Sequence, residues 1–201
     1  MRRLRTLSKG DIAHWEKITN DLVTLKNTSE MMMDLAYSAV LLNSQYLAEE
    51  VRLLEEQIDN LHFEFQYEVL SKTETASDPR DLLGLIRLGS VTERIADAAS
   101  EIAEVVLRGI EPHPVLQMVI QDAEETVERA TLSEDSPIIG KTLRKAKIAE
   151  ETGMWVLVIR RGDKWIRPRP GTILRAGDVI IASGYSEGEE DFVQLLTGKS
   201  S

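Results

Sequence analysis

The spacing of apolar residues changes near residue 110, and this change divides the chain into two kinds of structure. Residues 20–108 hold three long stretches with helical periodicity and no strand pattern. In the second and third stretches, apolar residues recur at alternating intervals of four and three, which is typical of one packed face of a helix in a bundle. They are Leu47, Val51, Leu54, Ile58, Leu61 and Phe65, followed by Leu88, Val91, Ile95, Ala98, Ile102 and Val105. Asp78-Pro79 is a start signal for the third helix, and Gly109 with Pro112 ends it.

Short runs rich in β-branched residues follow this break and predict a small α+β domain. The expected strands are 126–132, Met154–Ile159, Trp165–Arg167 and Val179–Ala182. Turn residues at 161–164 join the second and third strands into a hairpin, and Pro168 limits the third strand to an edge or an early end. Glu187–Leu196 is expected to close the chain as an amphipathic helix. Its inward residues would be Phe192, Leu195 and Leu196.

The predicted fold class is therefore α + (α+β), an N-terminal antiparallel helical bundle followed by a small α+β domain. We expect an N-terminal tail over residues 1–19 and the helical bundle over 20–110. A linker with a short helix is expected over 111–124, and the α+β domain over 125–198.

Composition excludes several classes of protein. The chain has 201 residues and no cysteine, so it can hold neither a disulfide nor a thiolate metal site, and we expect a cytoplasmic location. Its longest apolar stretch, Met31–Leu42, is interrupted by Asp34 and is too short to cross a bilayer, so no transmembrane segment is expected. The net charge of -10 argues against nucleic acid as a partner.

Recognisable catalytic motifs are missing from the sequence. Gly140-Lys141-Thr142 resembles the end of a P-loop, but Asp135 stands where that motif needs its first glycine. The three histidines do not pair at metal-ligand spacing, and no nucleophile and base stand in a recognisable arrangement. We therefore expect no enzymatic activity and no catalytic residues.

Basic residues concentrate in one part of the C-terminal domain. Residues 141–175 hold ten basic side chains and three acidic ones, which suits either a small anionic ligand or a solvated basic face. The turns at Ser136-Pro137, Gly140 and Gly162, and the helix expected to begin near Lys141, would add backbone donors for phosphate. The candidate ligand-binding residues are Arg161, Arg169, Lys141, Arg160 and Arg167.

Carboxylates at a spacing of four occur on the first and third helices, as Glu30 with Asp34 and Glu93 with Asp97. This spacing puts both carboxylates on one side of a helix, where they repel. A divalent metal ion held between neighbouring helices would compensate for this repulsion, and we expect the four groups to approach one another across the bundle.

Each carboxylate pair also has an alternative interpretation without metal. Glu93 and Asp97 could simply belong to a solvent-exposed, acidic face of the helix. Asp34, the sole charge in Met31–Leu42, is expected to be buried with a cation, an arginine or a backbone donor as its partner. Glu55 and Asp59 repeat the spacing on the second helix and are interpreted as surface acids.

Residues 136–184 carry a series of short features in a particular order. They are the Ser136-Pro137 turn, Gly140–Leu143 opening a short helix, the strand Val156–Arg161, then Gly162, Pro168 and Thr172, and the Ala176-Gly177-Asp178 turn. In this order and spacing they resemble the C-terminal ligand-binding domain, RCK_C or TrkA_C, of TrkA-type regulators of potassium transport. The resemblance implies a domain that dimerises, some members of which bind cyclic dinucleotides or other anions at the dimer interface. The chain has no Gly-x-Gly-x-x-Gly, so the NAD-binding domain that usually precedes it is not implied.

The helical part has a resemblance of its own. Three helices with Glu-x-x-x-Asp on the first and third, and above all the stretch Val91–Ala99, resemble the repeat of PhoU proteins, the bundle-type regulators associated with phosphate uptake. That resemblance implies metal clusters at such motifs. PhoU has two repeats where this chain has one, so a complete cluster would require two subunits.

Together these features predict a cytoplasmic regulatory protein of cation transport, with potassium as the expected ion. The C-terminal domain would sense a small anionic ligand, such as a cyclic dinucleotide or another nucleotide, and would form a homodimer through residues 125–198. The helical domain would contact a membrane channel or transporter subunit. The alternatives are a PhoU-like metal-binding regulator of phosphate homeostasis and a metal-dependent hydrolase.

Overall fold

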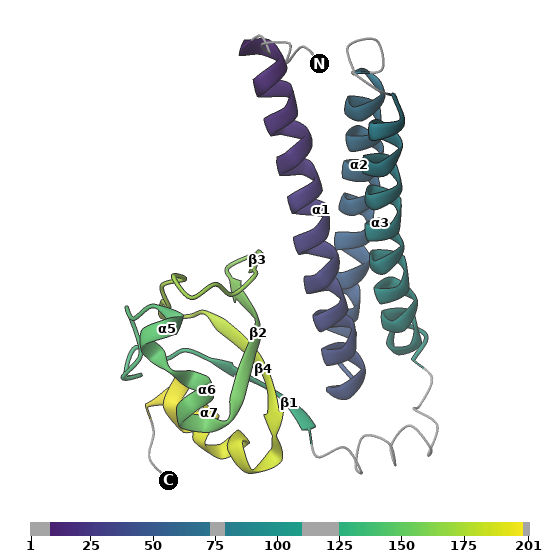
Figure 1. The fold of residues 1–201 in the computed structure, drawn as a ribbon. Helices are drawn as coiled ribbons and strands as arrows, with labels where there is room; N and C mark the ends of the chain where they lie inside the picture. The colour runs from purple at the N-terminus through teal and green to yellow at the C-terminus, as the bar shows by residue number, and fades with distance from the viewer. Residues whose placement is uncertain (1–8, 73–78, 110–124, 199–201) are drawn as a thin grey trace.

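The computed structural model describes residues 9–72, 79–109 and 125–198. Its first part is an antiparallel bundle of α1 (Lys9–Leu41), α2 (Gln45–Leu70) and α3 (Pro79–Leu107), which run down, up and down beside one another in Figure 1. The predicted bundle is confirmed, but its start is not. Helix α1 begins at Lys9, so the described part of the predicted tail is helical. The short helix expected within 111–124 lies outside the described residues.

Local sequence explains the turn between α1 and α2. Asn43 adopts a left-handed conformation with φ 45°, which asparagine tolerates better than most residues. Ser44 then caps α2, and its side chain accepts a hydrogen bond from the Leu47 backbone N–H at 3.3 Å. Such a cap satisfies one of the free donors in the first turn of a helix.

The stripe predicted on α2 faces the core, whereas the one predicted on α3 does not. On α2, Val51 and Phe65 are completely buried. On α3, the residues toward the core include Ala96, Ala99 and Ala103, and the predicted stripe lies mostly at the surface. Its exposed members are Leu88, Val91, Ile95 and Val105. The alanines also recur at intervals of three and four, so periodicity alone could not identify the inward face of α3.

The second part is an antiparallel sheet in the order β1-β4-β2-β3. Its strands are β1 (Glu125–Thr131), β2 (Met154–Arg161), β3 (Lys164–Ile166) and β4 (Val179–Tyr185), close to the predicted positions. A register shift between Val156 and Val158 marks a bulge in β2. The short helices are α5 (Leu143–Ala146), α6 (Ile148–Thr152), the 3-10 turn η1 (Ser186–Gly188) and α7 (Glu189–Thr197).

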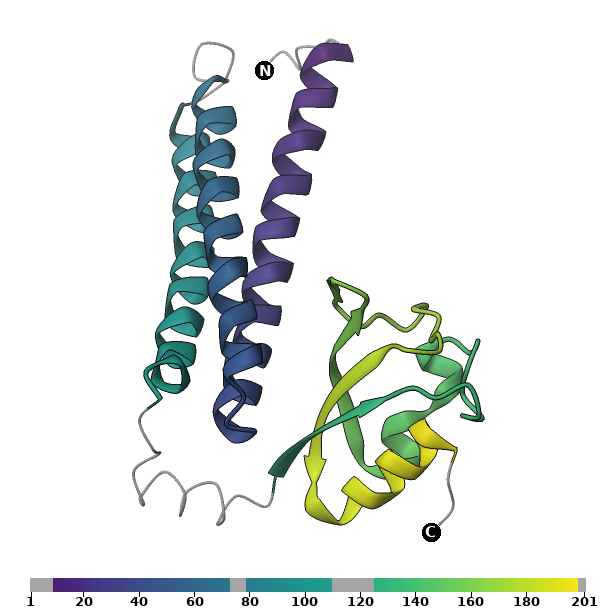
Figure 2. The same ribbon diagram turned by 180° about the vertical axis from the view of Figure 1, so that it is seen from behind.

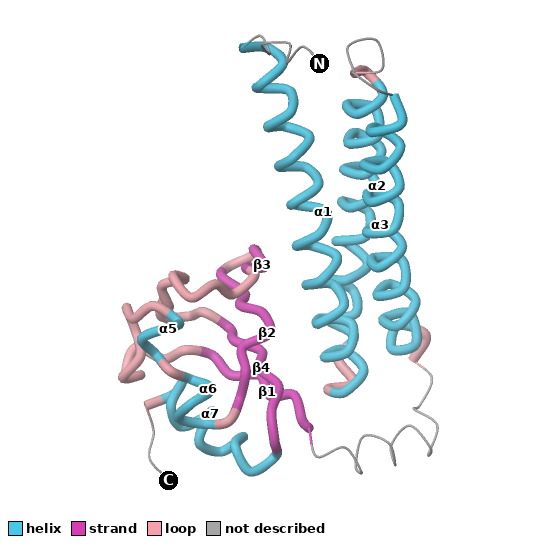
Figure 3. The backbone as a smooth tube through the Cα atoms, viewed as in Figure 1, coloured by secondary structure: helices cyan, strands magenta, loops and turns pink. Residues whose placement is uncertain are grey.

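Both faces of this sheet are covered. Helices α6 and α7 cover one face over a core that includes Met154, Ile159 and Phe192. The opposite face lies toward α1 (Figures 2 and 3), and Val127, Val158 and Ile181 on that face belong to the same apolar cluster as the bundle core. The two parts therefore share buried surface. Within the described residues, no helix is both long and apolar enough to span a membrane.

Candidate functional site

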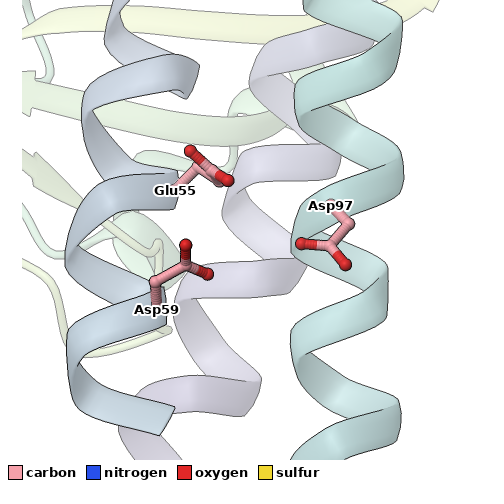
Figure 4. Close-up of side chains that lie close together, drawn as sticks. All are labelled: Glu55, Asp59 and Asp97. Carbon is pink, nitrogen blue, oxygen red and sulfur yellow. The ribbon is translucent and has the colours of Figure 1, made fainter. Parts of the chain in front are cut away.

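Three carboxylates meet between α2 and α3. Glu55 and Asp59 come from α2 and Asp97 from α3, and each offers an oxygen within 4.8 Å of the other two (Figure 4). Glu55 and Asp97 are half-buried, and Asp59 is exposed. The three groups thus converge from two neighbouring helices and are open to solvent on one side. We call Glu55, Asp59 and Asp97 the acidic cluster.

Packing further along the same two helices sets this convergence. A Cβ added at Gly89 would come 2.6 Å from the Phe65 ring, so glycine at this position allows α3 to approach α2 closely. Near it, Gln66 Nε2 donates a hydrogen bond to Ser90 Oγ at 3.3 Å, and His62 Nε2 lies 3.3 Å from the same hydroxyl. These contacts fix the register of the helix pair and place Asp97 opposite Glu55 and Asp59.

Burial and neighbouring carboxylates raise the pKa of Glu55 in the acidic cluster. Burial raises the pKa of Glu55, and the negative charges of Asp59 and Asp97 raise it further. Burial also raises the pKa of Glu93, one turn before Asp97, with Asp97 as the next largest cause. The neighbouring cation Arg52 hydrogen-bonds to Glu49 and Glu56. A set of oxygen donors with an excess of negative charge has the chemistry that binds a hard divalent cation.

Only part of the predicted metal set lies at the acidic cluster. Asp97 belongs to the acidic cluster and Glu93 lies beside it, but the expected approach of Glu30 and Asp34 to these two residues is wrong. The carboxylates of α1 lie on the side toward the sheet. There Arg167 contacts Glu30, and its charge lowers the pKa of Asp34 against the effect of burial. The other two members of the acidic cluster are Glu55 and Asp59, which share the spacing of four but had been interpreted as surface acids.

Glu30 and Asp34 differ in their electrostatic surroundings. Burial raises the pKa of Glu30, but a hydrogen bond from Lys26 and the charge of Arg167 outweigh it and leave that pKa below its usual value. Lys26 Nζ lies 2.6 Å from the Glu30 carboxylate. Burial raises the pKa of Asp34, and Arg167 opposes this shift. Asp34 is half-buried, so it is less enclosed than its apolar surroundings in the sequence suggest.

Arg161, a candidate ligand-binding residue, is held within its own domain. Its Nε and one terminal nitrogen each lie 2.7 Å from an oxygen of Asp178, and the terminal nitrogen also donates to the Ile173 carbonyl at 2.7 Å. Asp178 is 1% exposed, and it also accepts a hydrogen bond from the Arg175 backbone N–H. This arrangement ties β2 to the turn before β4.

Two further candidate arginines contact the helical bundle. Arg167 pairs with Glu30 and donates a hydrogen bond to Asn27 Oδ1 at 2.9 Å. The Arg160 guanidinium lies 4.9 Å from the centre of the Tyr46 ring, within the range of a cation–π contact. Trp165 Nε1 donates to Glu50 Oε2 at 2.8 Å. Sequence reasoning missed this interdomain contact because its partners lie far apart along the chain.

The remaining two candidates, Lys141 and Arg169, are exposed. The nearby backbone donors do not point to a ligand, because Gly140 N–H bonds the Leu174 carbonyl and Leu143 N–H bonds the Thr172 carbonyl, both at 2.9 Å. An open pocket of about 540 Å³ near Pro137 is lined by acidic residues. Its acids are Asp135, Glu151 and Asp191, which disfavour an anion there.

Two family models match the chain, one for each part. The model of the PhoU domain matches residues 22–106, and the model of the TrkA-C domain matches residues 127–197. The two matches divide the chain where the hydrophobic pattern changes.

Curated relatives match mainly short parts of much longer proteins. Potassium channel protein 1 of Methanocaldococcus jannaschii is 29% identical over 84 residues, covering 41% of this chain and 25% of that protein. Probable potassium channel protein 2 of the same organism is 33% identical over 87 residues, covering 42% and 25%. The uncharacterized transporter bll3475 of Bradyrhizobium diazoefficiens is 44% identical over 52 residues, covering 26% and 10%. The chain thus spans a quarter or less of these relatives.

Two of the solved structures to which the chain is similar are RCK C domains. The RCK C domain of the potassium transport protein KtrA, solved with cyclic diadenosine monophosphate, is 23% identical with a TM-score of 0.33. The match covers 40% of this chain and 94% of that one. The RCK_C domain dimer of S. agalactiae BusR, also bound to that nucleotide, is 23% identical with a TM-score of 0.33. It covers 38% of this chain and all of that chain.

Proposed function

Because this chain joins a PhoU domain to a TrkA-C domain, we propose that it regulates the transmembrane transport of a cation, with potassium as the first candidate. The observation that carries the proposal is the TrkA-C match over residues 127–197. The two potassium channel proteins of M. jannaschii among the curated relatives support potassium as the ion. The proposed role is regulatory and involves no catalysis.

The contacts between the two domains support a regulatory role. Arg167 bonds to α1, Trp165 bonds to Glu50 at the start of α2, and both residues lie in or beside the β2–β3 hairpin. A ligand that moved this hairpin would change those contacts, and the bundle would then respond. Differential contact of this kind is what couples a sensing domain to an output domain.

The ligand in this proposal is a small anion, such as a cyclic dinucleotide or another nucleotide. Arg160, Arg161 and Arg167 are committed to protein partners, which leaves exposed Lys141 and Arg169 as the residues proposed to contact it. A homodimer through residues 125–198 would bring two such sets of basic residues together. The small size of that domain favours burying a shared face.

A second candidate function rests on the acidic cluster. Glu55, Asp59 and Asp97 place three oxygens within 4.8 Å of one another, and the pKa of Glu55 is raised by its acidic neighbours. We propose that this cluster takes a divalent metal ion and that the PhoU domain then serves phosphate homeostasis. Residues on one helix pair supply three ligands, so water or a second subunit would complete the coordination.

Uptake measurements separate the two functions. Deleting the gene in its host should change the rate of rubidium uptake, used as a potassium analogue, and leave phosphate uptake unaltered. The opposite result would favour phosphate homeostasis over potassium regulation.

Calorimetric titration of the whole chain with cyclic di-AMP, ATP and AMP tests the ligand. Lys141→Ala with Arg169→Ala should weaken the binding, whereas Arg144→Ala with Lys145→Ala, two exposed cations nearby, serves as the matched control.

A further inference from the structure

Helix α3 buries several alanines and exposes several larger apolar residues, although Leu82 and Val106 near its ends are also buried. Ala96, Ala99 and Ala103 are at most 1% exposed and face the bundle core. Leu88, Val91, Ile95 and Val105 are each at least 40% exposed, and Ala98 and Ile102 are half-buried beside them. A lone three-helix bundle would gain more by burying the larger side chains, because burial free energy grows with apolar area. The outward face of α3 therefore has the composition of a second packing surface.

These exposed and half-buried residues form one stripe along α3, which we call the α3 seam, and Ile102 in it also packs against the bundle core. Its members are Leu88, Val91, Ile95, Ala98, Ile102 and Val105, spaced three and four apart. At 1.5 Å per residue the seam is about 27 Å long. This spacing is the heptad pattern by which one helix packs along another over several turns.

The α3 seam is separate from both candidate sites. Asp97 follows Ile95 by two residues, which is more than half a turn around the helix, so the acidic cluster faces another direction. Helix α1 lies between the sheet and the α2–α3 pair in Figures 1 and 2. The seam therefore lies on a helix that is remote from the TrkA-C domain.

We propose that the α3 seam binds the α3 seam of a second copy of this chain in antiparallel orientation. The seam is complementary to itself when it is reversed about a two-fold axis near residues 96 and 97. Leu88 then faces Val105 of the second copy, Val91 faces Ile102, and Ile95 faces Ala98. Each layer pairs an a position of one helix with a d position of the other, as in antiparallel coiled coils. The large side chain of Ile95 fills the space that the small Ala98 of the other copy leaves.

Charge favours this arrangement at the centre of the seam. Arg94 and Glu101 flank the seam on one side, and both are exposed. In the antiparallel pair, Arg94 of each copy faces Glu101 of the other, which gives two opposite-charge contacts. Arg87 faces Arg108 at the ends, where Arg108 already hydrogen-bonds Glu104 at 3.1 Å. A parallel pair would instead stack Ala98 on Ala98 and leave a gap in the apolar layer.

The pairing is independent of a dimer through residues 125–198. The sheet lies beside the lower half of α1 in Figure 1, so the two-fold axis sends the two TrkA-C domains toward opposite ends of the paired helices. A variant that breaks the α3 contact should leave any TrkA-C contact intact. Failure of this inference would not count against the proposed function.

Disulfide trapping tests the orientation directly, because the chain has no cysteine to give background. The double variant Val91→Cys with Ile102→Cys should form disulfide-linked dimers of the whole chain under mild oxidation. Val91→Cys alone should not, since it faces residue 102 of the other copy. Val23→Cys, on an exposed valine of α1, is the control. Cross-linking of Val91→Cys alone would show a parallel pair, and no cross-linking of the double variant would refute the proposal.

Light scattering tests the contribution of the seam without cross-linking. Val91→Glu should lower the mass of the particle at micromolar concentration. Val23→Glu should not, although the two valines are similarly exposed, at 41% and 47%. Circular dichroism of both variants checks that the helices persist. An unchanged mass for a folded Val91→Glu variant would contradict the interface.

Discussion

Arg161 shows how a residue chosen for binding can be structural. Its position in a basic segment suggested a ligand contact, but its guanidinium makes two 2.7 Å hydrogen bonds to Asp178, which is almost completely buried. The hydrogen bond that Arg161 donates to Asp178 is the main reason that the pKa of Arg161 is raised. A planar guanidinium fits a carboxylate at two points, which lysine cannot reproduce.

Asp178→Ala should therefore destabilise the protein. It would leave Arg161 partly buried without its carboxylate and the Arg175 N–H without an acceptor, at a cost of about 2–4 kcal/mol in the free energy of unfolding. Urea denaturation followed by circular dichroism measures this. Arg169→Ala, at an exposed position of the same segment, should change stability by about 0.5 kcal/mol or less. Equal effects of the two substitutions would contradict the structural role of Arg161.

At the scale of elements, sequence patterns identified helices and strands better than they identified faces. The strands and the closing helix lie close to their predicted positions because turns and β-branched runs are local signals. The face of α3 was assigned wrongly because its alanines and its larger residues both recur with helical spacing. The acidic cluster depends on the rotation and register of α2 against α3, set by Gly89 against Phe65, and no local pattern reveals this.

Asp97→Asn tests the electrostatics of the α2–α3 pair. Burial and neighbouring acids raise the pKa of folded Glu55 above its unfolded value. The stability that Glu55 contributes is therefore present at acid pH and is lost as pH rises through its folded pKa. Without divalent metal, Asp97→Asn removes one repulsive charge and should stabilise the protein at pH 7 by about 0.5 kcal/mol. The gain should vanish at a pH where the carboxylates are protonated.

The same variant tests metal binding. If the acidic cluster binds Mg²⁺ or Ca²⁺, either ion should raise the melting temperature of the wild type, and Asp97→Asn should abolish that shift. Glu64→Gln, which neutralises an exposed acid elsewhere on α2, should preserve it. An equal shift in all three proteins would show that the ions act outside the cluster.

At the scale of the whole molecule, the contact between the two domains could not be read from the sequence. Val127, Val158 and Ile181 look like ordinary strand residues, yet they share an apolar cluster with the bundle core. Arg167 looks like a solvated cation, yet it reaches Asn27 and Glu30 on the first helix. Such contacts depend on the shapes of both domain surfaces, so the sequence pattern of either domain alone does not predict them.

A double-mutant cycle of Glu30→Gln and Arg167→Gln should measure this interdomain contact. Both side chains are partly exposed, so we expect a coupling free energy of about 0.5–1 kcal/mol at pH 7 and low salt. Burial alone would raise the pKa of Glu30, but Lys26 and Arg167 hold it below the usual value. The coupling should therefore persist above the unfolded pKa of about 4.3 and disappear as pH falls through the folded pKa.

Pairing Glu30→Gln with Arg169→Gln gives the matched control, because Arg169 is exposed and lies two residues beyond Arg167 in the same segment. That cycle should show no coupling. If the Glu30–Arg167 cycle also gave none at neutral pH, the hairpin could not transmit a signal to the bundle through this ion pair. The signal would then have to pass through the apolar contacts of the sheet with α1.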